Sequence, residues 1–240
     1  MPSLGAFSTK NGGLPSHGRL SLPRRKKSFS ILLLPSNDKG QMTKSFRSEP
    51  FLWIHLAGIA IAPLLLQIVW LGLAVGDPLP FVWLELLFLT IVGIVPVFWM
   101  QWQRPFDIFS LLLVALKPET LSQQQRQILS QLKTNKQRIL SLVVALGMFW
   151  VLWQLYRLAP LAALAAAALP QWRILGLSIA GLAFLASNLF VQVPVSVLGV
   201  LATSEQQLSA TEPFPSEQIP QQFTVPGFKV DKILPTLALD

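Results

Sequence analysis

Two ionisable side chains with the potential to do chemistry, Glu85 and His55, lie within long apolar stretches of this sequence. Glu85 is the only acidic residue in those stretches, and an ionisable group inside a membrane-length segment indicates proton or cation handling. A structural role is simpler, because Arg157 ends another apolar stretch near the same expected membrane face. We therefore expect a structural Glu85–Arg157 ion pair, with proton or cation handling as the alternative.

A lone histidine in an apolar segment, such as His55, could ligate a chlorophyll magnesium or a haem iron. Such a histidine more often forms a hydrogen bond to a neighbouring helix. At ~1.5 Å per helical residue, His55 and Glu85 should lie roughly 20 Å apart, which excludes a shared acid–base site. His55 is therefore the one candidate for pigment binding, and hydrogen bonding is the simpler expectation.

The rest of the chemical inventory offers little to an enzyme. The sequence has no cysteine, which excludes disulfides, thiolate metal ligands and thiol nucleophiles. His17 is the only other histidine, and the apolar stretches contain no paired carboxylates and no Ser/His/Asp set. We expect no enzymatic activity, no metal site and no cofactor.

A transporter or channel is the rival class, and it would need polar side chains that converge at mid-membrane. The side chains available at that depth are Gln67, Thr90, Ser178, Asn188 and Gln192. Asn188 and Gln192 lie one helical turn apart, which places them on one face of a helix. We expect these two residues to form interhelical hydrogen bonds.

Four apolar stretches must position all of these residues: 51–75, 81–100, 139–156 and 174–201. Each has at least 18 residues, enough to cross a hydrocarbon layer of roughly 30 Å. The sequence therefore predicts an all-α integral membrane protein with four transmembrane helices. The short turn at residues 76–80 makes the first two spans antiparallel, and Gly176-xxx-Ala180 is a pattern that permits close helix contact.

The 101–138 loop between the second and third spans should form an interfacial amphipathic helical region on the cytoplasmic side. Residues 106–117 are apolar but too short to cross a membrane, which favours an interfacial or re-entrant helix. The following polar segment has a thin apolar stripe, and Ser122 with Gln125 resembles a capping box. We expect this second helix to lie on the membrane surface.

Both chain ends differ in composition from the membrane domain, for which we expect residues 42–202. Residues 1–41 hold seven of the 19 Lys/Arg and one of the 11 acidic residues, so most of the +8 charge lies there and nucleic-acid binding is not indicated. This segment is either a disordered leader or a mis-called start, with Met42 as the expected true start. The composition of residues 203–240, rich in Gln, Pro, Ser, Thr and Glu, predicts a flexible low-complexity tail. Its apolar residues, among them Phe223 and Phe228, could dock on a partner.

Basic residues near the spans predict the orientation, because cytoplasmic loops are enriched in Lys and Arg. Eight lie on the side of the 101–138 loop, but only Arg157 and Arg173 lie on the other, which places both termini in the cytoplasm. Those in the loop are also candidates for contact with anionic lipid or a partner: Arg104, Lys117, Arg126, Lys133, Lys136 and Arg138.

Three blocks of sequence resemble a known family. They are FRSEPFLWIHLAG at residues 46–58, LGLAVGDPLPFVWLELL at 71–87, and FWMQWQRPFDIFSLLLVALKPETLSQQQRQIL at 98–129. They are similar to the cyanobacterial low-complexity tail membrane proteins, over roughly residues 42–201. The resemblance implies a cyanobacterial thylakoid or plasma membrane, and it implies no activity and no catalytic residues.

These observations favour a non-enzymatic accessory or scaffold factor that acts through its cytoplasmic loop and tail. Its expected partners are the lipid bilayer and another membrane protein. The alternatives are a small transporter or channel component and a pigment-binding protein that uses His55.

Overall fold

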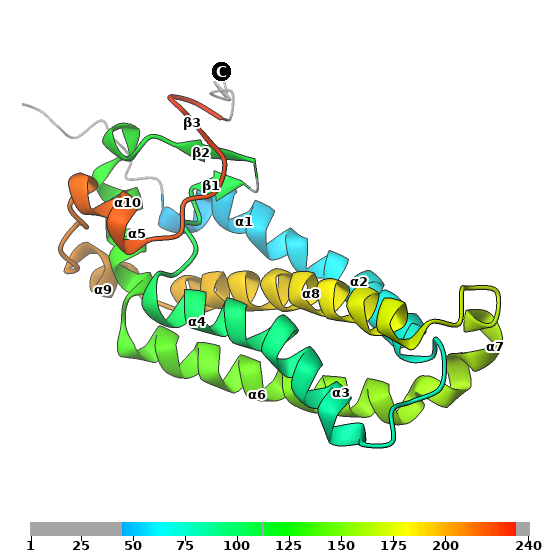
Figure 1. Ribbon diagram of the computed structural model, residues 1–240. Helices are drawn as coiled ribbons and strands as arrows, with labels where there is room; N and C mark the ends of the chain where they lie inside the picture. The colour runs from blue at the N-terminus through cyan, green and yellow to red at the C-terminus, as the bar shows by residue number, and fades with distance from the viewer. Residues whose placement is uncertain (1–44, 112, 234–240) are drawn as a thin grey trace, which may run out of the picture. The chain divides into compact units, whose positions relative to one another are not determined.

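The computed structural model describes residues 45–111 and 113–233, so our expectations for residues 1–41 and for the end of the tail fall outside it. Within the described ranges, four helical segments are long and apolar enough to cross a membrane. They are Pro50–Leu73, Val82–Gln103, Asn135–Ala166 and Arg173–Leu201, with mean hydropathies of 1.9 to 2.2. The four predicted spans are therefore confirmed (Figure 1).

Each of the first two spans contains an irregular turn just before a proline. Span one consists of α1 (Pro50–Ala57), a 3₁₀ turn η2 (Gly58–Ile61) and α2 (Ala62–Leu73). Span two consists of α3 (Val82–Leu89), a π-helical turn η3 (Thr90–Ile94) and α4 (Val95–Gln103). Pro63 and Pro96 each lie within the first two residues of the helix that follows. Because proline donates no backbone hydrogen bond, the preceding turn changes its helical pattern.

The third span is longer than predicted, and the fourth is uninterrupted. Span three contains α6 (Asn135–Leu158), η5 (Ala159–Ala162) and α7 (Ala163–Ala166). The alanine-rich residues after position 158 thus extend the span beyond its predicted end at residue 156. The fourth span is one helix, α8 (Arg173–Leu201), which continues through Pro194 without a break.

Helix α8 contacts each of the other three spans and is the centre of the bundle. Its closest approach is to α2, which lies against it in Figure 1. A Cβ atom added to Gly72 would lie 2.8 Å from the Gly176 carbonyl oxygen and 3.1 Å from the Ala180 Cβ. The predicted close contact at Gly176 and Ala180 is thus confirmed. Apolar residues from several spans, including Leu89, Leu152 and Phe184, form the core of the bundle.

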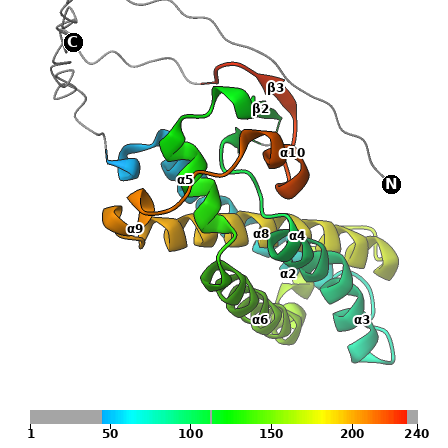
Figure 2. The same ribbon diagram turned by 90° about the vertical axis from the view of Figure 1, so that its left-hand side faces the viewer.

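The loop after span two and the chain after span four pack together in a unit that we call the cap (residues 104–134 and 203–233). Its loop part contains strands β1 (Ser110–Leu111) and β2 (Val114–Leu116), the 3₁₀ turn η4 (Pro118–Thr120) and helix α5 (Gln123–Leu132). Its tail part contains α9 (Glu205–Ser209), η6 (Ser216–Gln218), α10 (Ile219–Gln222) and β3 (Phe228–Val230). Figure 2 shows α5 and α10 together at the end of the spans where η1 (Phe46–Ser48) also lies.

The prediction of a helix at residues 106–117 is wrong. β1 and β2 pair antiparallel, and β3 from the tail pairs in parallel with β2. The chain can approach this closely at Gly227, whose φ is 85° and where an added Cβ would lie 2.2 Å from the Leu113 carbonyl carbon. The backbone groups of β2, which we expected to bond within a helix, instead bond to β3, a strand more than 100 residues away in the chain. The helix after it is confirmed: α5 begins with the Ser122–Gln125 capping box.

The prediction of a flexible tail is also wrong for the described residues 203–233. Leu208, Ile219 and Phe223 are almost fully buried, in one core with Ile128 and Leu129 of α5. The same core includes residues from the adjacent ends of spans one and four, such as Leu52 and Val197. We expected the apolar residues of the tail to bind a partner. Phe223 is instead buried against this chain's own loop, whereas Phe228 is 80% exposed.

Candidate functional site

Glu85 forms a buried ion pair with Arg173, the first residue of α8. The Arg173 Nε donates to Glu85 Oε1 at 2.7 Å, and its Nη2 donates to Oε2. The same carboxylate accepts from the Leu79 backbone N–H at 2.8 Å and from the Tyr156 hydroxyl at 2.9 Å. Glu85 is 0% exposed. A buried carboxylate requires this degree of pairing, because an uncompensated charge would be costly to bury.

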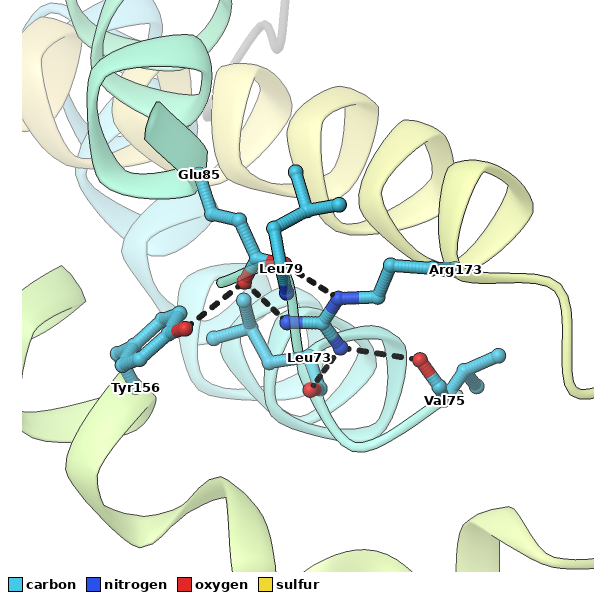
Figure 3. A network of polar contacts seen from close by, with 6 residues as sticks. All are labelled: Leu73, Val75, Leu79, Glu85, Tyr156 and Arg173. Carbon is cyan, nitrogen blue, oxygen red and sulfur yellow. Dashed lines mark hydrogen bonds and ion pairs between the residues drawn. The ribbon is translucent and has the colours of Figure 1, made fainter. Parts of the chain in front are cut away.

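Arg173 also caps the end of the first span. Its Nη1 donates to the carbonyl oxygens of Leu73 at 2.7 Å and Val75 at 3.0 Å, where the last carbonyls of α2 have no helical partner. Figure 3 shows these contacts around the guanidinium. With Tyr156 from span three, this network, which we call the clasp, joins all four spans at the end that carries the 76–80 turn.

The predicted ion pair between Glu85 and Arg157 is therefore wrong. The partner from span three is Tyr156, and its neighbour Arg157 is exposed. Successive helical residues point about 100° apart, so Tyr156 and Arg157 cannot both face Glu85. In the sequence, Arg157 and Arg173 lie equally close to this membrane face. The packing of α8 is what places Arg173, and not Arg157, beside Glu85. The carboxylate is saturated by protein donors, an arrangement that favours a structural role over proton or cation handling.

His55 lies at the opposite end of the bundle, beside an apolar cavity. Its Nδ1 donates to the Phe51 carbonyl oxygen at 2.9 Å, within its own helix, because a carbonyl can only accept. Its ring packs edge-on against Phe106, with centroids 5.8 Å apart. The cavity has a volume of about 400 Å³, and His55 shares its lining with apolar residues such as Phe190 and Pro194. The expected hydrogen bond to a neighbouring helix is thus replaced by one within the helix and one to the Ser110 backbone of the loop.

A row of buried polar side chains joins α6 and α8. Ser141 Oγ donates to Gln192 Oε1 at 3.2 Å, which confirms an interhelical bond at Gln192. One turn towards the cap, Gln137 Nε2 donates to the Ser196 carbonyl oxygen at 2.9 Å. Asn188 bonds instead within its own helix, from Nδ2 to the Phe184 carbonyl oxygen at 3.0 Å.

Sequence reasoning missed the α6 side of this row. Gln137 and Ser141 are spaced one turn apart, as are Gln192 and Ser196, and this matched spacing on two spans was the available signal. Of the other three polar residues considered for transport, Gln67 and Ser178 are exposed on the outer surface of the bundle. Thr90 Oγ1 donates to the Leu86 carbonyl oxygen within its own span at 2.7 Å. The mid-membrane polar residues therefore do not converge on one path.

Two basic residues of the loop, Arg104 and Lys133, bind the tail part of the cap. Arg104 Nη2 donates to the carbonyl oxygens of Pro220 at 2.8 Å and Phe223 at 3.2 Å. Lys133 donates to the Gln222 side chain, and its Nζ lies 5.6 Å from the centre of the Phe223 ring.

The other basic residues of the loop have more exposed positions. Lys117 pairs with Asp231 at 2.9 Å, and this hydrogen bond raises the pKa of Lys117. The Arg138 guanidinium lies 5.9 Å from the Trp102 ring centre. Lys136 is exposed, whereas the Nε of Arg126 is buried without a hydrogen-bond partner among the described residues.

Asp107 is a buried carboxylate that sequence reasoning did not select. Its Oδ1 accepts from the Phe109 backbone N–H at 2.9 Å, and its backbone N–H donates to the Thr224 carbonyl oxygen at 3.0 Å. The side chain lies where the loop and the tail join. Burial raises the pKa of Asp107 to about 6, against the smaller opposing effect of the Phe109 hydrogen bond.

The comparison with protein families agrees with this architecture. A family model described as low-complexity tail membrane protein-like matches residues 48–235. The chain belongs to this family. The match includes the four spans, the clasp residues and the described tail, so it extends beyond residue 201, where we expected the resemblance to end. No curated protein and no solved structure matches this chain.

Membership of the low-complexity tail membrane protein-like family supports an integral membrane location and assigns no activity. Among the described residues, no group of three or more His, Cys, Asp or Glu side chains could hold a metal ion. The two polar features described above are the clasp at one end of the bundle and the basic cap at the other.

Proposed function

We propose that this protein is a non-enzymatic accessory or scaffold factor that binds a membrane-protein partner through its cap. The observation that carries the proposal is the cap itself, in which loop and tail share a core with the ends of spans one and four. A partner bound to the cap would thus be held rigidly relative to the membrane. The ionisable residues within the spans support the same reading, because Glu85 is engaged within the protein.

The proposal includes an orientation in which the cap and both termini are cytoplasmic. Its support is the excess of Lys and Arg in the sequence on the cap side of the spans: eight lie in residues 42–50 or in the 101–138 loop, against two on the clasp side. The membrane would be a cyanobacterial thylakoid or plasma membrane, which rests on the sequence resemblance alone.

The contact surface must lie on the outside of the cap, because the tail's Phe223 is already buried against the loop. Phe228 is 80% exposed on β3, and Lys229 beside it is also exposed. Aromatic residues, Phe among them, are enriched in the core of protein interfaces, and the rim around that core is polar. We place the centre of the partner surface at these two residues.

Affinity purification of the tagged chain from its native membrane in mild detergent tests this proposal. We expect a stoichiometric partner that is lost from Phe228→Ser/Lys229→Glu and retained by Arg157→Glu, a charge reversal at an exposed position on the other end of the bundle. A wild-type chain that purifies alone, or a partner that stays bound to the cap variant, would contradict the proposal.

Pigment or haem binding is a second candidate, and the cavity beside His55 favours it. A metal-ligating histidine usually donates its other ring N–H to an acceptor such as a backbone carbonyl, as the His55 Nδ1 does to Phe51. The same purification tests it. Visible absorption that disappears in His55→Ala would favour this candidate, and a colourless wild-type protein would refute it.

A further inference from the structure

We propose that Arg104, Lys133 and Arg138 form a binding site for the phosphate headgroup of an anionic lipid. This goes beyond the partner-binding role proposed above. Arg104 is the first residue after span two, and Lys133 and Arg138 flank the start of span three. The three cations lie close enough to influence one another at this junction of the cap with the spans.

The site lies at the depth where a lipid headgroup is expected. Arg104 directly follows the last residue of α4, and Lys133 and Arg138 flank the start of α6. Trp102 is partly exposed beside Arg138. Tryptophan is enriched at the membrane–water interface, so Trp102 marks this level as the boundary between acyl chains and headgroups.

The positions of the three cations are fixed by contacts with the cap and with α4. Arg104 and Lys133 both contact Phe223, one at its carbonyl oxygen and the other over its ring. The Arg138 guanidinium is held over Trp102. A site of ordered cations binds an anion with less loss of side-chain freedom than flexible surface lysines would.

The cluster has an excess of positive charge. Burial lowers the pKa of Lys133, and the nearby charges of Arg138 and Arg104 lower it further. In the described part of the chain, the ion pairs are Lys117–Asp231 and Arg173–Glu85, and neither involves this cluster. Like charges held together destabilise one another until an anion binds between them.

Phosphate is the anion that this geometry suits. Guanidinium groups form paired hydrogen bonds with phosphate oxygens, and a lysine adds a point charge. The lipid source is favoured over free phosphate because exposed apolar side chains of the adjoining helices, Trp99 of α4 and Ile139 of α6, continue from the site along the bundle. They offer a surface for the acyl chains of the same molecule.

Native mass spectrometry of the full chain, titrated with phosphatidylglycerol or phosphatidylcholine, tests the proposal. We expect one preferred phosphatidylglycerol molecule, with affinity reduced about five-fold by Arg138→Gln and roughly 100-fold by the triple glutamine variant of the site. The single variant serves as the second test, because Arg138 makes no hydrogen bond to the tail among the contacts described.

The matched control is Arg157→Gln, which like Arg138→Gln removes one exposed cation but at the clasp end of the bundle, and it should bind phosphatidylglycerol like the wild type. Equal loss of binding in this control and in the site variants would overturn the proposal, as would equal wild-type affinity for phosphatidylcholine. Displacement of the lipid by millimolar inorganic phosphate would identify a free-phosphate site and overturn the assignment to lipid.

Discussion

Replacing Arg173 by alanine should destabilise this protein more than any other single charge removal in the bundle. The Glu85 carboxylate is 0% exposed in the wild type, and the variant leaves it with the Leu79 N–H and the Tyr156 hydroxyl as its remaining donors. It also leaves the Leu73 carbonyl without the cap that Arg173 provides. Removing one partner of a buried ion pair costs about 3–5 kcal/mol, and we expect Arg173→Ala to fall in this range.

The assay is unfolding in mixed micelles with increasing SDS, followed by tryptophan fluorescence, which yields a free energy of unfolding. Arg157→Ala is the control, because it removes an exposed cation from the same end of the bundle and should cost less than about 1 kcal/mol. The double variant Glu85→Gln/Arg173→Gln should be more stable than Arg173→Ala, since it buries no unpaired charge.

Two results would refute this reasoning. One is an Arg157→Ala variant that loses as much stability as Arg173→Ala, which would restore the ion pair expected from the sequence. The other is an Arg173→Ala variant within about 1 kcal/mol of the wild type, which would mean that Glu85 is not held as a buried charge.

Three further predictions concern the cap and the polar row. Phe223→Ala should cost about 3–5 kcal/mol and make the tail sensitive to limited proteolysis while the spans stay intact; an unchanged digestion pattern would argue against a packed tail. Because the pKa of Asp107 is raised to about 6, the folded chain binds more protons than the unfolded chain between about pH 4 and pH 6. The free energy of unfolding should therefore fall by about 3 kcal/mol as the pH rises through this range, and Asp107→Asn should remove that fall; identical pH profiles would contradict it. Gly199→Ala places a Cβ 2.6 Å from Gln137 Nε2 and should cost about 1–2 kcal/mol relative to Gly147→Ala, where an added Cβ meets nothing within 4 Å; equal melting of the two variants would show that the row tolerates the added atom.

The spans could be predicted from the sequence because length and hydropathy decide them locally. The partner of Glu85 could not. Arg157 and Arg173 lie near the same membrane face in the sequence, and the choice depends on the rotation of α6 and on the position of the α8 N-terminus. Hydropathy does not report rotation. The pairing of Gln192 with Ser141 was accessible in principle, because both spans carry polar residues at one-turn spacing.

The cap was missed for a different reason. β2 pairs with a strand more than 100 residues away, and no local pattern in residues 106–117 predicts that pairing. The tail has a polar composition, and only a few apolar residues, such as Leu208, Ile219 and Phe223, anchor it. Composition averages over such anchors, so it predicted disorder for a segment that is packed in the structure.

The clasp has a consequence for how this protein enters the membrane. Glu85 is synthesised 88 residues before Arg173, so the second helix reaches the bilayer while its carboxylate has no cation to meet. An acidic residue costs energy in an apolar layer until it is neutralised or paired. The buried ion pair of Glu85 can therefore form only after span four has been made. Span four, the last of the described spans, thus completes the polar contacts of span two, and we expect a chain that stops before residue 173 to leave span two poorly retained in the membrane.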